Sequence, residues 1–348
     1  MAVTIDGSYG EGGGQILRTA LSLSALLGRE TRIERIRAGR ERPGLRPQHL
    51  AGVRALARMS GAKVEGGNIG SQSLSFLPGK VKGGFYRFNV AEERRSAGAV
   101  TLILQVLLLP LAFSTTSSEV MLLGGTHVPW SPSFHYLSMV LLPTLARMGL
   151  RCEAEIGKWG WYPRGGGWMR VTIHPVHELE PLDLSSRGRL RRISGISGTS
   201  NLPSHIARRQ QERAHQRLEE RLGVVPEIHI TDKVSSTGQG TLLFLLLESE
   251  GVVSGFSALG RRGKPAEVVA DEAVDQLIEY VDSGRCVDPH LSDQLIPFLG
   301  RAKGRSVFSV SRITRHLITN VWVVQQFLDI RIDVKGREGE PGRVEIHP

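Results

Sequence analysis

Hydrophobic residues recur along this chain with the three-to-four-residue spacing of amphipathic helices, in three successive pairs. The pairs are Gly14–Gly28 with Pro47–Glu65, Ser96–Phe113 with Pro132–Glu153, and Pro289–Gly300 with Ser311–Ile332. An Ala-Arg-Met triplet lies at residues 57–59 and 146–148 in the second helix of the first two pairs, each time close to a glycine expected to end the helix, Gly61 or Gly149. This shared register favours an internal repeat over a coincidence between amphipathic helices. Alternating segments such as YRFNV and MRVTIHP predict strands, so the repeated unit is expected to be two helices on a small sheet.

The stretch from Ser185 to Asp282 does not follow this repeat. It contains the strand-like segments RRISGISG, EIHITD and GTLLFLLLES, a long polar helix at His205–Gly223, and a helix around PAEVVADEAVDQLIEYV. The third helix pair follows only after this stretch. We therefore predict an inserted smaller α/β domain at residues 185–282, and a larger catalytic domain of three repeats at residues 1–184 and 283–348.

Composition and charge favour a soluble protein with a polyanionic partner. Apolar residues make up 40% of the 348 residues and charged residues 22%, which is typical of globular proteins. The longest apolar stretch, Val100–Phe113, is too short to span a bilayer, and the first residues lack the pattern of a secretory signal. We expect a cytoplasmic protein with no membrane partner, and Cys152 and Cys286 as free thiols. The net charge of +10 favours nucleic acid, although many proteins are simply basic.

Two N-terminal segments have the residue types of a phosphate site. In Gly7–Arg18, GSYGEGGGQILR, glycines let backbone N–H groups approach an anion at the start of a helix. Glu11 would repel that anion unless a divalent cation bridges them, and the alternative is a turn with a solvated glutamate. The segment before the helix opened by Gln48 and His49 carries arginines at 32, 35, 37, 40, 42 and 46. The planar guanidinium group of arginine can donate two hydrogen bonds to phosphate oxygens, which favours a phosphate-binding loop. The alternative is a charged surface exposed to solvent.

Further positions are candidates for catalysis or ligand binding. Gln105 is an amide inside an apolar helix, so it must be hydrogen-bonded, either to protein or to a nucleotide. His316, in TRHLITN, can offer a ring nitrogen to phosphorus, whereas many histidines at a helix start only cap it. Asp293, in HLSDQ, could orient that ring or help to bind a metal. The aromatic and basic residues of Gly157–Val171 either stack bases or cap the core.

Together these motifs resemble one family, the RNA 3′-terminal phosphate cyclases. The matching segments are GEGGGQILR, IRAGRERPGL followed by PQHL, LILQ, GWYPRGGG, SALGRRGKPAE, SDQL and RHLITN, which occur in the family's order from Gly10 to Asn320. The resemblance implies an α/β (α+β) fold of three repeats, each a four-stranded sheet backed by two helices, interrupted by a smaller α/β domain. This fold agrees with the repeat and the insertion predicted above.

The resemblance also implies an ATP-dependent reaction on an RNA with a 3′-phosphate end. His316 would attack the α-phosphorus of ATP and release pyrophosphate, and AMP would then pass from the histidine to the RNA phosphate. Attack by the neighbouring 2′-hydroxyl would release AMP and leave a 2′,3′-cyclic phosphate. Such phosphoryl chemistry needs positioning and neutralisation of charge more than further covalent machinery.

The family's site residues carry over to matching positions of this chain. By resemblance, ATP would be bound by Gln105, Pro132, His290, Leu291, Ser292, Asp293 and Gln294. The phosphates of ATP or of the RNA end would be bound by Arg18, Arg37, Arg40, Gln48 and His49. Glu11 would help to hold a divalent metal, Mg or Mn. Two positions depart from the family pattern, because His290 stands where an aromatic residue is expected and His127 where a small polar residue is usual.

Three other hypotheses remain open. A relative of this family serves ribosome assembly without the catalytic residues, but His316, Glu11 and the arginine loop are present here. An RNA- or DNA-end binder with a vestigial ATP site would bind nucleic acid independently of ATP and of His316. An enolpyruvyl transferase on the same repeated fold would take small anionic substrates and give His316 no role. The sequence leaves open the RNA, the preferred metal and the oligomeric state, with a homodimer as one alternative.

Overall fold

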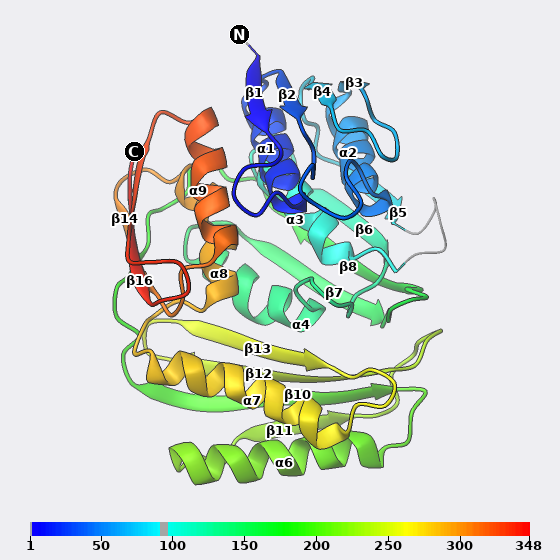
Figure 1. Ribbon diagram of the computed structural model, residues 1–348, viewed down its shortest axis with the longest axis vertical. Coiled ribbons are helices and arrows are strands. Elements are labelled where there is room, and N and C mark those ends of the chain that lie inside the picture. Colours follow the sequence, from blue (N-terminus) through cyan, green and yellow to red (C-terminus); the bar gives the residue numbers. More distant parts are fainter. Residues whose placement is uncertain (1, 91–96) are drawn as a thin grey trace.

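The computed structural model describes residues 2–90 and 97–348, and its first repeat lies at the N-terminal end (Figure 1). This repeat consists of β1 (Val3–Asp6), α1 (Gly14–Leu27), β2 (Thr31–Glu34), α2 (Pro47–Ser60), β3 (Lys63–Glu65) and β4 (Leu74–Leu77). Its strand order is β1-β2-β4-β3, in which β1 and β2 are parallel and β4 is antiparallel to both neighbours. The crossover through α1 allows the parallel pair.

The second repeat has the same order of elements and the same pairing. It consists of β5 (Phe85–Asn89), α3 (Val100–Ala112), β6 (Ser118–Gly124), the helical segments α4 (Phe134–Tyr136), η1 (Leu137–Leu141) and α5 (Leu142–Ala146), β7 (Cys152–Lys158) and β8 (Gly167–Ile173). Its strand order is β5-β6-β8-β7, with β5 parallel to β6 and the other pairs antiparallel. The two sheets are therefore built alike, as the helix pattern predicted.

The third repeat is interrupted after its first strand. It consists of β9 (Asp183–Leu184), α8 (Pro289–Leu299), β14 (Ser306–Val310), α9 (Arg315–Phe327), β15 (Arg331–Lys335) and β16 (Gly342–His347). Read from β9, its order β9-β14-β16-β15 matches those of the first two sheets, and β9 is parallel to β14. The fold class predicted from the sequence is confirmed, and the structure adds that the insertion lies within the third repeat rather than before it.

The insertion forms a fourth sheet with two helices. Its elements are β10 (Leu190–Ser200), α6 (His205–Leu222), β11 (Glu227–Thr231), β12 (Gly240–Ser249), β13 (Val253–Leu259) and α7 (Ala266–Asp282). The strand order is β11-β10-β12-β13, and Figure 1 shows this sheet below the repeats. All of these elements fall within residues 185–282, and the division into domains at those boundaries stays a prediction.

Strand β12 joins the insertion to the repeats because both of its faces are buried. Phe244 and Leu246 belong to the large core of the repeats, whereas Leu243 and Leu245 belong to a second core with residues of α6 and α7. Successive side chains of a strand point to opposite faces, so this sheet contacts the repeats on one face and its own helices on the other. Two-sided burial explains the continuous apolar run in this strand.

Some segments predicted as helical extend past the observed helix ends, although the helix end predicted at Gly61 is confirmed. Gly61 adopts a left-handed conformation with φ of 63° and ends α2, so Lys63–Glu65 forms a strand instead of a last helical turn. The predicted helices Pro132–Glu153 and Ser311–Ile332 likewise include the starts of β7 and β15. The predicted helix start at Ser96 lies outside the described residues.

The aromatic hairpin between β7 and β8 mostly caps the core. Trp159 and Trp161 are 6% and 3% exposed, and a Cβ on Gly198 or Gly240 of the insertion would lie within 2.7 Å of one of their rings. Tyr162, in contrast, is 66% exposed. The interpretation as a core cap therefore holds for the two buried tryptophans and leaves Tyr162 unexplained.

The cysteines and the helices have two further properties that bear on function. Cys152 and Cys286 are free thiols, and burial raises the pKa of each to about 12, so neither is a candidate nucleophile. Among the described residues, no helix combines the length and the apolar character needed to cross a membrane.

Candidate active site

Most predicted site residues come from helices of the first and third repeats and from the loops before them, and Gln105 and Pro132 come from the second repeat. Helix α1 contacts α9 and α3, and α8 contacts α9. Figure 1 shows α9 between α1, in the upper part of the molecule, and α8, which lies near its middle. The starts of α1, α2 and α9 meet in this region, and the start of a helix presents free N–H groups and positive potential to an anion.

His316 is the second residue of α9 and lies two residues after the capping residue Thr314. Its Nε2 atom lies 3.1 Å from Oε2 of Glu11, and 46% of its side chain is exposed, so a ligand can reach the ring. Burial lowers the pKa of His316, Glu11 opposes that change, and the cations Arg18 and Arg40 add to it. The net lowering favours the neutral ring, which is the form that can attack phosphorus.

The glycine-rich loop before α1 positions Glu11. Gly10 has a left-handed backbone with φ of 56°, and a Cβ there would lie 2.5 Å from Oγ1 of Thr319 in α9. The backbone N–H of Glu11 donates to the same Oγ1 at 3.3 Å. The carboxylate of Glu11 then lies between His316 and Arg40 and contacts both.

The side chains of Arg18 and His49 come together next to the Cα atom of Gly14, at the start of α1. A Cβ on Gly14 would lie 2.5 Å from Nε2 of His49 and 2.9 Å from Nη1 of Arg18. The Nδ1 atom of His49 accepts the backbone N–H of Arg46 at 3.1 Å, and burial with nearby arginine charge lowers the pKa of His49 to about 3. The neutral ring therefore carries its proton on Nε2, so both side chains present donors at the same place.

The arginine loop before α2 reaches the same group. Arg40 donates from Nη2 to the backbone carbonyl of Glu11 at 2.9 Å and also to its carboxylate. Arg37 has a left-handed backbone with φ of 54° and donates to the carbonyl of Arg42 at 2.7 Å, which shapes the loop. Burial lowers the pKa of Arg37, and the charges of Arg46 and Arg40 lower it further. Cations are therefore gathered here at an electrostatic cost that an anion would relieve.

Two glutamine side chains link α3 to the other site helices. Gln48, at the start of α2, donates to the Ala99 carbonyl at 3.4 Å and accepts the Ala99 N–H at 3.3 Å. Gln105 donates to Oε1 of Gln294 at 2.8 Å, and Gln294 donates to the His290 carbonyl at 2.8 Å. Oε1 of Gln105 is buried without a hydrogen-bond partner among the described residues. Since such an acceptor is costly to leave unpaired, it is suited to accept a donor from a ligand.

Asp293 interacts with Arg18 in the interior between α1, α8 and α9. Burial raises the pKa of Asp293 to about 8, while Arg18 opposes that rise. The Asp293 carbonyl accepts Nδ2 of Asn320 at 2.8 Å, and Oδ1 of Asn320 accepts the hydroxyl of Thr19 at 2.7 Å. These bonds fix the three helices relative to one another. A carboxyl group with a strongly raised pKa beside a cation is typical of functional sites.

The remaining predicted ATP-binding residues differ in accessibility. His290 is exposed at the start of α8. Pro132 is half-buried, and its carbonyl accepts the hydroxyl of Thr101 at 2.8 Å. The side chains of Leu291 and Ser292 are fully buried, so any contact with a ligand would come from their backbone atoms. The binding roles of all these residues stay predictions.

Comparison with known sequences identifies the family. A family model described as RNA 3′-terminal phosphate cyclase matches residues 9–334, a range that includes every predicted site residue from Glu11 to His316. The chain belongs to the RNA 3′-terminal phosphate cyclase family.

Relatives named RNA 3′-terminal phosphate cyclase match over nearly their whole length. The protein of Thermococcus onnurineus (strain NA1) is 47% identical over 345 residues, which cover 99% of this chain and 98% of the relative. The protein of Methanopyrus kandleri is 45% identical over 352 residues, which cover 99% of both chains. The protein of Methylococcus capsulatus is 47% identical over 347 residues, which cover 99% of this chain and 96% of the relative.

The metal prediction for this member of the cyclase family rests on one carboxylate. The described residues contain no group of three or more His, Cys, Asp or Glu side chains that could hold a metal ion. Glu11 offers a single carboxylate next to the convergent donors of Arg18 and His49. This arrangement fits a cation completed by phosphate oxygens, as is common for magnesium, rather than a cage made of protein ligands.

Asp288 organises the start of α8 in this cyclase-family chain and was not among the predicted site residues. Its Oδ1 accepts the N–H groups of His290 and Leu291 at 2.9 and 3.0 Å, and the hydroxyl of Tyr136 at 2.8 Å. The Asp288-Pro289 pair is a typical N-cap followed by a proline in the first helical position, so the cap could have been predicted. The bond to Tyr136 could not, because Tyr136 lies in the second repeat.

Proposed function

We propose that this protein is an ATP-dependent RNA 3′-terminal phosphate cyclase that carries AMP on His316. The observation that supports this most directly is the imidazole of His316, which is accessible, has a lowered pKa and lies 3.1 Å from Glu11. Arg18 and Arg40 both act on it electrostatically. Transfer of a nucleotide from a triphosphate requires a nucleophile with cations nearby that neutralise phosphate charge.

In the first step, the unprotonated ring nitrogen of His316 attacks the α-phosphorus of ATP. A nitrogen–phosphorus bond forms, the bond to the bridging oxygen breaks, and pyrophosphate leaves with the electron pair. Arg18 and the Nε2–H of His49 stabilise charge on the phosphate oxygens, and Glu11 orients the imidazole. A divalent cation, Mg or Mn, would bind Glu11 and substrate phosphates and neutralise part of their charge.

In the second step, an oxygen of the RNA 3′-phosphate attacks the phosphorus of the bound AMP. The nitrogen–phosphorus bond breaks, and the electron pair returns to His316. The 2′-hydroxyl then attacks the terminal RNA phosphorus, loses its proton to solvent and displaces AMP, which leaves a 2′,3′-cyclic phosphate. Arg37 and Arg40 would hold the RNA 3′-phosphate close to the AMP bound to His316.

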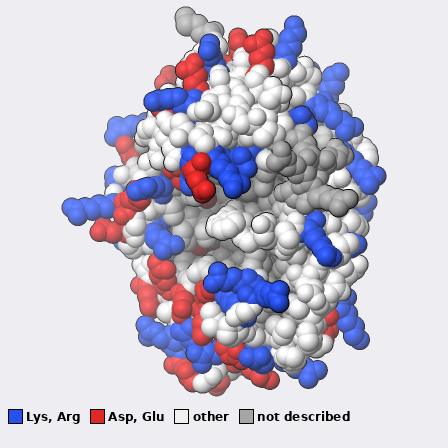
Figure 2. All heavy atoms as spheres, turned by 45° about the vertical axis from the view of Figure 1, so that its right-hand side comes forward, with Lys and Arg blue, Asp and Glu red and all other residues white. Residues whose placement is uncertain are grey.

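The charge distribution supports an RNA substrate. The chain carries 44 Lys and Arg against 34 Asp and Glu. Figure 2 shows Lys and Arg atoms both above and below a hollow that crosses the middle of one face. A polyanion in this hollow would meet cations from both sides. The proposal includes a cytoplasmic location, where both RNA and ATP are present.

The test is the conversion of a 5′-labelled RNA oligonucleotide that ends in a 3′-phosphate, with ATP and Mg²⁺ or Mn²⁺. The RNA 3′ end should become resistant to phosphatase because its phosphate is cyclic, and AMP and pyrophosphate should form in equal amounts. His316→Ala should abolish conversion, whereas His177→Ala, at an exposed histidine, should leave it unchanged. A protein that binds the RNA equally well without ATP and leaves its end sensitive to phosphatase would instead be an RNA-end binder.

A further inference from the structure

Two aromatic side chains near the candidate site are exposed to solvent. Trp130 is 95% exposed and Tyr162 is 66% exposed. The neighbouring Trp159 and Trp161 are almost fully buried. Exposure of such large rings forgoes the hydrophobic free energy that burial would supply, so the core does not account for Trp130 and Tyr162.

The two exposed aromatic residues lie on adjoining loops at one end of the second sheet. Strands β6 and β8 pair up to the end of β6 at Gly124, so the loop after β6 and the β7–β8 hairpin leave the sheet at the same end. The backbone N–H of His127 donates to the Gly160 carbonyl at 3.0 Å, and His127 forms a β-bridge with Trp161. These contacts join the loop that carries Trp130 to the hairpin that carries Tyr162.

The same end of the sheet is connected to the candidate site. The hydroxyl of Thr101, in the first turn of α3, donates to the Pro132 carbonyl at 2.8 Å. The N-cap of α3, Ala99, is bonded through its backbone to the amide of Gln48, next to His49. Trp130 is two residues from Pro132 in the sequence, so their Cα atoms are at most roughly 7 Å apart. The exposed ring therefore lies beside the loop and helix start that border the predicted nucleotide site.

The backbone holds Trp130 in its exposed position. Its φ of 60° lies in the left-handed region, which is an outlier for a bulky residue. The hydroxyl of Ser131 donates to the Val128 carbonyl at 2.9 Å, and prolines at 129 and 132 restrict the chain on either side. Conformations of this kind are concentrated at ligand-binding sites, where the surrounding structure maintains them.

We propose that Trp130 and Tyr162 form a stacking surface for the unpaired bases that precede the 3′-phosphate of the RNA substrate. This inference rests on the proposed function, since the RNA end must reach His316. Aromatic rings bind single-stranded nucleic acid by stacking on base faces, which every base offers, so the surface adds affinity with little sequence preference. Arg164 is exposed on the same hairpin and supplies a cation for the RNA backbone.

The experiment compares Trp130→Ala, Tyr162→Ala and the double variant with wild-type protein. Phe85→Ala is the matched control, because Phe85 is 63% exposed and lies at the start of β5, at the other end of the same sheet. Binding of fluorescent, 3′-phosphorylated RNAs of about ten nucleotides is measured by anisotropy, and transfer of AMP to the protein is measured with ATP alone. Cyclisation is measured for the same RNAs and for a nucleoside 3′-phosphate.

The proposal predicts a Kd and a KM for the longer RNA that rise roughly 10-fold for each aromatic residue removed. AMP transfer from ATP alone, and turnover of the nucleoside 3′-phosphate, should not change. An equal loss in AMP transfer would place the rings at the ATP site, and a change in oligomeric state would place them at an interface between copies. Unchanged RNA affinity in the double variant would also overturn the proposal. Because binding is measured without turnover, this result is independent of whether the cyclase reaction itself occurs.

Discussion

The Nε2 atom of His316 lies 3.1 Å from Oε2 of Glu11, although the two residues belong to different repeats. His316 is at the start of α9 in the third repeat, and Glu11 is in the loop before α1 in the first. The packing of α1 against α9 therefore assembles the candidate site. Neither repeat contains it alone.

Glu11→Gln tests the contribution of this carboxylate, because it removes the charge and keeps the size of the side chain. We expect AMP transfer to His316 to slow by roughly 10–100-fold, the usual effect of losing a group that orients a functional side chain. If Glu11 also binds the cation, the deficit should shrink as the Mg²⁺ concentration is raised. Glu34→Gln, at an exposed carboxylate paired with Arg32, is the control. Unchanged rate and unchanged Mg²⁺ dependence would remove Glu11 from the metal site.

Arg40→Ala tests recognition of the terminal phosphate. Loss of one charge-assisted donor should weaken binding of 3′-phosphorylated RNA by about 10-fold. The slope of log affinity against log salt should become shallower by about 0.7, because one phosphate contact is lost. The same RNA with a 3′-hydroxyl should be affected much less, and Arg32→Ala should affect neither. Equal losses for both RNA ends would show that Arg40 acts as a general basic residue.

Trp161→Ala tests the interpretation of the hairpin as a core cap. Trp161 is 3% exposed, and a Cβ on Gly240 would lie 2.1 Å from its ring, so the ring packs directly on the insertion. Its removal should lower the free energy of unfolding by about 3–5 kcal/mol, measured by urea denaturation. Val225→Ala, at a residue that is 63% exposed, should change it by less than about 0.5 kcal/mol. A similarly small effect for Trp161→Ala would contradict the role in the core.

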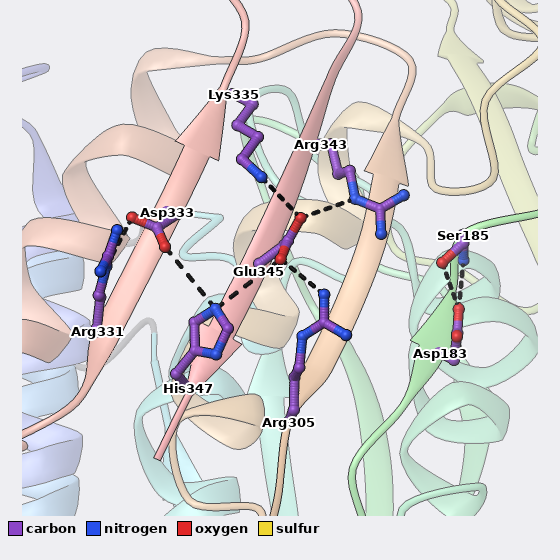
Figure 3. A network of polar contacts seen from close by, with 9 residues as sticks. All are labelled: Asp183, Ser185, Arg305, Arg331, Asp333, Lys335, Arg343, Glu345 and His347. Carbon is purple, nitrogen blue, oxygen red and sulfur yellow. Dashed lines mark hydrogen bonds and ion pairs between the residues drawn. The ribbon is translucent and has the colours of Figure 1, made fainter.

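Glu345 gives a stability prediction that depends on pH. On the face of the third sheet that points away from the core, its carboxylate accepts hydrogen bonds from Arg305 at 2.7 Å and from Lys335 and Arg343 at 3.0 Å (Figure 3). These bonds, with that of Arg305 first, lower the pKa of Glu345 from 4.5 to about 2. A carboxyl group with a depressed pKa stabilises the fold above its ordinary pKa, and this contribution is lost as the pH falls toward the folded-state pKa.

The melting temperature should therefore fall more steeply in wild-type protein than in Glu345→Gln as the pH is lowered from about 5 to about 2. Above about pH 5 the variant should be the less stable of the two. Glu340→Gln, at an exposed carboxylate, should follow the wild-type curve. Parallel curves for wild type and Glu345→Gln would mean that the network does not stabilise the fold.

The repeats and the insertion could be predicted because paired amphipathic helices leave a periodic pattern in the sequence. That the insertion follows the first strand of the third repeat could not be predicted, since β9 has only the two residues Asp183–Leu184 and pairs with a strand beyond the insertion. The predicted end of α2 at Gly61 is confirmed, although the segment described as helical continued to Glu65. The helix formers Lys63 and Glu65 concealed the change to a strand, which the β-branched Val64 favours.

The sequence proposes which residues form the candidate site, but it does not show how they lie relative to one another. Glu11 and His316 meet only when separate repeats pack. The fully buried side chains of Leu291 and Ser292 follow the exposed His290 directly, and a motif does not show which side of a helix faces the core. The proton position on His49 likewise depends on a backbone contact that no local pattern specifies.

The most direct test of the central claim uses ATP labelled at the α-phosphate, without RNA, in the presence of Mg²⁺ or Mn²⁺. The account predicts label bound covalently to the protein, labile to acid and stable to alkali as expected for a phosphoramidate, and absent from His316→Ala. Folded wild-type protein that acquires no label, or a His316→Ala variant that keeps it, would contradict the role of His316.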